Sequence, residues 1–118
     1  MKNLLFLFFL VVSLLACRTL NSTTYIESGQ SFVLGKGTHG NYQAQIRNVG
    51  KYNIEVLQNN AGVTASLGYL KPNEKQLYPV AKNVTVMFKN ASTEKAAIEI
   101  KLVGDTGLSM GYEENAGK

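Results

Sequence analysis

The stretch Asn41–Leu70, NYQAQIRNVGKYNIEVLQNNAGVTASLGYL, decides the fold class of this chain. Within it the runs YQAQI (42–46), YNIEV (52–56) and VTASLGY (63–69) alternate apolar with mostly polar residues. Turns rich in Asn and Gly separate the three runs. A period of two residues is typical of a strand that buries one face. The stretch therefore predicts three strands in succession, with the first two paired as a hairpin.

Similar runs flank this stretch on both sides. They lie at Tyr25–Ile26, Ser31–Leu34, Gln76–Val80, Val84–Phe88, Ala96–Leu102 and Leu108–Tyr112. Pro79 cannot donate a main-chain hydrogen bond, which places its strand at a sheet edge. The segment STEKAAIEIKLV (92–103) contains helix formers, but its strict alternation and β-branched residues favour a strand. The sequence thus predicts an all-β, antiparallel β-sandwich of about eight short strands in Greek-key or jelly-roll order.

The first 16 residues, MKNLLFLFFLVVSLLA, place a positive charge at Lys2 before an apolar run that begins at Leu4. The run is shorter than the roughly 20 residues of a membrane-spanning helix and is typical of a signal peptide. Ordinary cleavage after Ala16 would require a small residue at Leu14, where a bulky one stands. The ordinary cleavage site is therefore poor.

The segment Leu14-Leu15-Ala16-Cys17 instead resembles the lipobox of bacterial lipoproteins, although Leu15 is larger than the usual residue. Cys17 is the chain's one cysteine, so it has no disulfide partner within the chain. The resemblance implies diacylglycerol transfer to Cys17 and cleavage before it. Two or more acyl chains hold a protein firmly at a membrane without spanning it.

The residues after Cys17 bear on localisation and domain organisation. Asp at this position retains lipoproteins of enteric-type bacteria at the inner membrane, whereas this chain has Arg18, so the resemblance implies the outer membrane. The segment CRTLNSTT (17–24) lacks the acidic residues that mark surface lipoproteins of some groups, which favours a periplasm-facing protein. We expect a signal peptide over 1–16, a lipidated Cys and short polar tether over 17–24, and one β-sandwich domain over 25–118.

The segment GKGTHG (35–40) has the spacing of a dinucleotide-binding turn. That turn works through a following helix whose N-terminus meets the pyrophosphate, whereas NYQAQIRNV (41–49) alternates like a strand. We therefore expect no nucleotide, and a connection that crosses from one sheet to the other. The net charge of +4 comes from scattered Lys residues, which argues against nucleic acid as a partner.

Residues suited to catalysis or metal binding are few. His39 is the one His and Asp105 the one Asp, so neither a zinc site nor a Ser-His-Asp arrangement with the usual context can be assembled. Calcium could use Asp105, Glu113 and Glu114, but their spacing matches no known calcium loop. The remaining Glu residues are dispersed. We expect no metal and no cofactor.

The leading hypothesis is a non-catalytic binding or scaffolding module for a protein partner in the cell envelope. Its partner surface could be a free strand edge, such as that of GDTGLSMGYEEN (104–115). An alternative is a glycan or small-ligand module that uses the loop Gly35–Tyr42, with His39 and Tyr42 as contacts. A hydrolase is the third hypothesis. The sequence leaves the oligomeric state open.

The tyrosines bear on the glycan alternative, because aromatic side chains can form a platform for sugar rings. Four of the six fall in phase with aliphatic residues on predicted strands, so we expect them in the core. They are Tyr42, Tyr52, Tyr69 and Tyr112.

Overall fold

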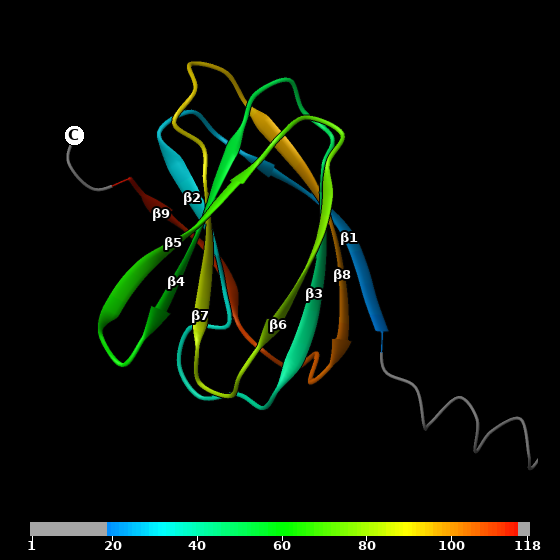
Figure 1. Ribbon diagram of the computed structural model, residues 1–118, viewed down its shortest axis with the longest axis vertical. Coiled ribbons are helices and arrows are strands. Elements are labelled where there is room, and N and C mark those ends of the chain that lie inside the picture. The colour runs from blue at the N-terminus through cyan, green and yellow to red at the C-terminus, as the bar shows by residue number, and fades with distance from the viewer. Residues whose placement is uncertain (1–18, 116–118) are drawn as a thin grey trace, which may run out of the picture.

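The computed structural model describes residues 19–115, which form nine antiparallel strands in two facing sheets (Figure 1). Within this range there is no helix, and hence none that could cross a membrane. The strands are β1 (Thr19–Ile26), β2 (Gln30–Leu34), β3 (Tyr42–Asn48), β4 (Ile54–Asn60), β5 (Val63–Leu70), β6 (Lys75–Val80), β7 (Thr85–Lys89), β8 (Ala96–Gly104) and β9 (Met110–Glu114).

The strand order is that of a jelly roll. One sheet has the order β1-β8-β3-β6 and the other the order β5-β4-β7-β2-β9. The first strand pairs with the eighth, the second with the seventh, the third with the sixth and the fourth with the fifth. The chain thus resembles one long hairpin wound around a core, with β9 added beside β2. The predicted sandwich is confirmed.

The core lies between the two sheets. Most strands turn an apolar face inward, and the largest fully buried side chains include Phe88, Ile46 and Leu102. The strand predicted over residues 96–102 is β8, the central partner of β1 and β3. Strand β6, which contains Pro79, lies at a sheet edge as predicted.

Two fully buried asparagines close the interior among the inter-strand loops. Asn48 donates from Nδ2 to the carbonyl oxygens of Tyr52 (2.7 Å) and Leu70 (2.9 Å), and its Oδ1 accepts from the Gly50 amide at 2.9 Å. Asn90 makes an equivalent set of bonds to the segments around β1 and β8. Because both side chains are saturated with partners, they can be buried without the usual desolvation cost.

Two predictions about the strands were wrong. Residues 19–24, expected within a polar tether, belong to β1, whose Thr19 lies opposite Val103 of β8. An edge strand gains its main-chain hydrogen bonds from one neighbour and can keep a polar outer face, so a polar run such as TLNSTT remains compatible with a strand. The runs that start at Tyr42 and Tyr52 do not form a hairpin, because β3 and β4 lie in different sheets. Alternation specifies a buried face but not which strand lies alongside.

The prediction of four core tyrosines holds for Tyr42 alone. Tyr52, Tyr69 and Tyr112 are exposed. In β5 the register shifts between Val56 and Leu57 of the neighbouring strand, so that Leu70 lies opposite Ile54 and points inward. A slip of one residue exchanges the two faces of a strand, and this irregularity turns Tyr69 outward.

Cys17 lies outside the described residues.

Candidate functional site

The GKGTHG loop leads from β2 in one sheet to β3 in the other, as predicted. No helix follows it. The Gly40 amide donates to Oδ2 of Asp105 at 2.6 Å, and the His39 amide donates to Oδ1 of Asn83 at 2.9 Å. These loop amides are therefore engaged by side chains of the chain itself, one of them a carboxylate. The loop connects neighbouring turns at one end of the sandwich.

His39 and Tyr42, the predicted contacts for a ligand or partner, are both buried, with 8% and 3% of their surface exposed. The ring nitrogens of His39 lie 2.7 Å from two carbonyl oxygens, Nδ1 from that of Gly40 and Nε2 from that of Val84. The two rings meet edge to face at 5.3 Å between centroids. We therefore correct that expectation: in this structure the two side chains hold the loop onto the core and do not reach the surface.

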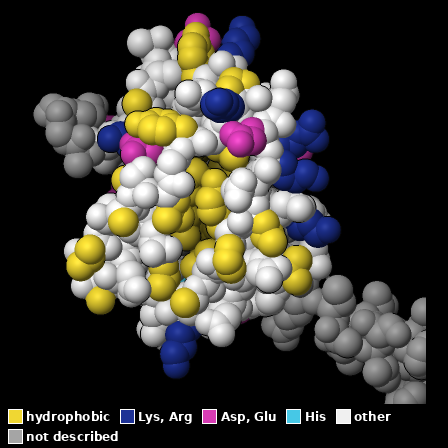
Figure 2. All heavy atoms as spheres, in the orientation of Figure 1, with side chains coloured by type: hydrophobic (Ala, Val, Ile, Leu, Met, Phe, Trp, Pro, Cys, Tyr) yellow, Lys and Arg dark blue, Asp and Glu magenta, His cyan; other side chains and the backbone are white. Residues whose placement is uncertain are grey.

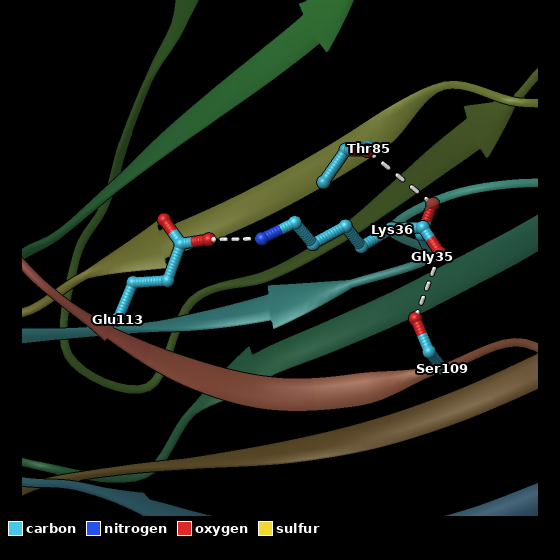
Figure 3. A network of polar contacts seen from close by, with 5 residues as sticks. All are labelled: Gly35, Lys36, Thr85, Ser109 and Glu113. Carbon is cyan, nitrogen blue, oxygen red and sulfur yellow. Dashed lines mark hydrogen bonds and ion pairs between the residues drawn. The ribbon is translucent and has the colours of Figure 1, made fainter.

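A second set of bonds ties the same loop to β7, to β9 and to Ser109, the residue before β9 (Figure 3). The Gly35 amide donates to the Ser109 carbonyl at 2.8 Å, and the Ser109 hydroxyl donates to the Lys36 carbonyl at 2.9 Å. Thr85 Oγ1 donates to the Gly35 carbonyl at 3.3 Å. The Lys36 ammonium pairs with Glu113 at 3.0 Å. The loop is thus fastened on both flanks.

The three carboxylates considered for calcium do not converge. Glu113 pairs with Lys36, and Glu114 accepts from the side-chain Nε2 of Gln30 at 3.2 Å. Asp105 accepts from the backbone amides of Gly40 and Gly107. Within residues 19–115 no group of three or more His, Cys, Asp or Glu residues is arranged to hold a metal ion.

The burial of Tyr42 leads us to expect that the folded protein loses stability at alkaline pH. Its hydroxyl has no hydrogen-bond partner among the described residues, and burial raises its pKa well above the ordinary value of 10.0. Burial and the Glu74 carboxylate raise the pKa of Tyr78 in the same direction. Above about pH 10 the unfolded chain therefore gives up protons that the folded chain keeps, and stability falls by up to about 1.4 kcal/mol per pH unit from Tyr42.

Urea denaturation between roughly pH 8 and 11 measures this dependence. The variant Tyr42→Phe should show a shallower decline, and at the lower pH it should be at least as stable as the wild type, because an unpartnered buried hydroxyl is removed. Equal declines in the two proteins would contradict the prediction.

The surfaces that remain available are the sheet edges and the outer sheet faces. The four edge strands are β1 and β6 in one sheet and β5 and β9 in the other. Strand β6 carries Lys75 and Pro79, and β9 carries two Glu residues. Strand β5, VTASLGYL, has neither a charge nor a proline. Charge and proline discourage an edge strand from pairing with another chain. Of the two edges of its sheet, β5 is therefore less protected against such pairing than β9.

Three large apolar side chains project from β5. They are Val63, Leu67 and Tyr69, with exposed fractions of 68%, 44% and 62%. The β4–β5 hairpin reaches beyond the body of the sandwich (Figure 1). On the side of the molecule seen in Figure 2, apolar side chains also gather in a hollow along the middle. Sequence reasoning missed β5 as a surface because its alternation predicted that Tyr69 and Leu67 would be buried.

No protein-family model matches the chain, and no curated protein matches it. Among solved structures, it is similar to an uncharacterised conserved protein with a double-stranded β-helix domain from Klebsiella pneumoniae, with a TM-score of 0.55 and 14% identity over 84% of this chain and 76% of that one. It is also similar to the Yersinia pseudotuberculosis-derived mitogen (TM-score 0.49, 12% identity, 79% and 91% covered). A cupin protein from Bacteroides fragilis gives a TM-score of 0.45 and 14% identity, with 85% and 76% covered.

At these identities the comparisons describe the fold alone. The Klebsiella protein supports the jelly-roll architecture, because a double-stranded β-helix winds paired strands in the same way. The candidate sites of this chain are therefore argued from its own residues.

Proposed function

We propose that the protein is a lipid-anchored, non-catalytic module of the bacterial cell envelope that binds a partner protein through the free edge of β5. The observation that carries the proposal is an edge strand of eight residues without charge or proline, from which Val63, Leu67 and Tyr69 project. An extended segment of a partner could add to this edge by main-chain hydrogen bonds and cover the three side chains.

The anchor is the second part of the proposal. The lipobox resemblance assigns acylation to Cys17, and β1 begins two residues later at Thr19. Two residues span at most about 7 Å, so the domain would sit close to the bilayer. The outer membrane with a periplasm-facing domain remains the proposed location, on the basis of Arg18 and the lack of acidic residues in CRTLNSTT.

The non-catalytic part rests on the placement of His39. Both of its ring nitrogens contact backbone carbonyl oxygens, so a general base at this position would first have to leave its site. This arrangement supports a binding module over the hydrolase that the sequence left as a third hypothesis.

Site-specific photocrosslinking in cells tests the β5 edge. A photoreactive residue at Tyr69 should give one discrete protein adduct, whereas the same residue at exposed Leu77, on the proline-containing edge β6, should not. Leu67→Lys places a charge on the edge and should reduce the Tyr69 adduct roughly tenfold, which corresponds to about 1.4 kcal/mol of binding free energy. Leu77→Lys is the matched control and should leave the adduct unchanged.

A Cys17→Ser form in the same experiment tests the anchor. It should incorporate no labelled palmitate, and it should lose the adduct if the partner is bound at the membrane. Adducts of equal intensity from Tyr69 and Leu77, or none from either, would contradict the proposed edge; palmitate incorporation into the Cys17→Ser form would contradict the anchor.

A further inference from the structure

The outer face of the four-stranded sheet carries a cationic depression of about 440 Å³ that the proposed function does not use. Three basic side chains line it, Arg47 of β3, Lys75 of β6 and Lys101 of β8, together with one acid, Glu99. None of the three basic side chains forms an ion pair within 4 Å among residues 19–115. Lys and Arg side chains accordingly gather along the side of the molecule formed by this sheet (Figure 2).

The register of the sheet places like charges together. Arg47 lies directly opposite Lys75 on one side and Glu99 on the other, and Lys101 lies opposite Gln45 in the adjoining row. Like charges directly opposite each other in an antiparallel pair destabilise it. The Glu99 carboxylate offsets one of the three positive charges of the depression, and the remaining charge is positive. An anion that lies over Arg47 and Lys75 would relieve the remaining repulsion, so the depression favours a negatively charged group.

An aromatic hollow adjoins the depression on the same face. It has a volume of about 260 Å³, its walls include Tyr25 and Tyr52, and small residues, Gly50, Ala96 and Ala97, form part of its lining. Tyr25, 58% exposed, follows Thr23 of the depression by two residues along β1, or roughly 7 Å. The Lys95 ammonium lies 5.9 Å from the centroid of the Tyr25 ring. An exposed tyrosine ring, with the Lys95 ammonium over it, therefore lies within one short step of the cations.

The other side chains of the depression are amides and hydroxyls. Asn21, Ser22, Thr23 and Gln45 line it beside the charged groups. They can donate to and accept from hydroxyl groups in several directions. The central strands β8 and β3 are paired on both sides, so their main-chain groups are not free to add another strand. Recognition on this face must therefore use side chains.

We propose that this face binds an acidic polysaccharide. A carboxylate of one sugar unit would lie on Arg47, Lys75 and Lys101, hydroxyl groups would meet Asn21 and Gln45, and a neighbouring sugar ring would cover Tyr25 in the hollow. An acidic peptide would satisfy the cations, but the amide and hydroxyl lining and the ring-sized aromatic hollow favour a sugar chain. This site is separate from the loop Gly35–Tyr42, which the sequence offered for a glycan or small ligand, and from the β5 edge.

Calorimetric titration of the full chain in detergent with oligogalacturonate tests the proposal. Arg47→Gln should weaken binding at least about tenfold, and Tyr25→Ala about threefold or more. Lys71→Gln removes an exposed cation in the β5–β6 turn and is the matched control, with unchanged affinity expected. The methyl-esterified oligomer keeps the sugar backbone without the charge and should bind at least about tenfold more weakly.

Three outcomes would overturn the proposal. The first is no binding of oligogalacturonate at low salt. The second is equal binding of a poly-glutamate peptide of the same charge, which would indicate an acidic peptide as the ligand. The third is an unchanged affinity of the Tyr25→Ala variant for oligogalacturonate, which would show that the face attracts anions in general and does not recognise a sugar ring. Because all three substitutions are on exposed side chains, thermal unfolding should show that the variants stay folded.

Discussion

Replacing Gly35 by Ala should destabilise the fold by about 3 kcal/mol or more. Gly35 has φ of +79°, a region that side chains with a Cβ rarely adopt. An added Cβ would also lie 2.9 Å from Nε2 of His39 and 2.9 Å from the hydroxyl of Tyr42. Both rings are buried, and His39 is held by the Val84 carbonyl at 2.7 Å, so neither can move without breaking the contacts that fasten the loop.

Gly37→Ala is the matched control for this prediction. Gly37 lies two residues further along the same loop with φ of +91°, but nothing lies within 4 Å of its added Cβ. The Gly37→Ala variant should lose only about 1–2 kcal/mol of folding stability, the cost of a positive φ at a residue with a Cβ. Denaturant unfolding of both variants separates the two effects. Equal losses would show that the rings yield and would contradict the role assigned to the His39 and Tyr42 contacts.

Asn90→Asp is the second substitution with a large expected effect, a loss of about 4 kcal/mol near neutral pH. The Asn90 side chain is fully buried, and its Nδ2 donates to the carbonyl oxygens of Ile26, Glu27 and Glu94 at 2.9, 3.2 and 2.8 Å. In the Asp variant a carboxylate oxygen would take the place of Nδ2. It cannot donate to the three carbonyl oxygens and would repel them. The opposite oxygen, Oδ1, would still accept from Ser92.

The loss should depend on pH in a definite direction. Carbonyl oxygens and burial would raise the pKa of the introduced carboxyl above its unfolded value of about 3.9. The folded variant then holds a proton that the unfolded variant releases, so its stability relative to the wild type recovers as the pH falls towards about 4. Urea denaturation at several pH values measures this. Asn60→Asp, at an exposed position of the β4–β5 hairpin, should change stability little at any pH.

The fold could be predicted from the sequence because a strand's period is a local property. The alternation in YQAQI placed Ala44 and Ile46 in the core, and Pro79 placed β6 at an edge. The pairing of β3 with β6 and β8 could not be predicted in this way, because every strand with one apolar face satisfies the same rule. The prediction that Tyr69 lies in the core was wrong for a related reason. The register of β5 against β4 shifts by one residue, which exchanges the inward and outward faces of β5.

The candidate site depended more heavily on the tertiary structure. GKGTHG could be read as a connection between strands, but its His39 could not be placed, because a loop side chain is buried only by what the topology brings beside it. Here the Val84 carbonyl, 45 residues away in sequence, supplies that contact. The row of two cations and one carboxylate, Arg47, Lys75 and Glu99, likewise comes from three strands that the register brings level.

By itself the sequence determined the all-β class and the inward face of most strands, since each depends on residues close together in the chain. The tertiary structure alone decided which polar residues are enclosed and which surfaces are free. Asn48 and Asn90 look like ordinary turn residues until loops from distant strands close over them. Burial and charge clustering are sums over neighbours in space, and the jelly-roll order, which alternation does not encode, selects those neighbours.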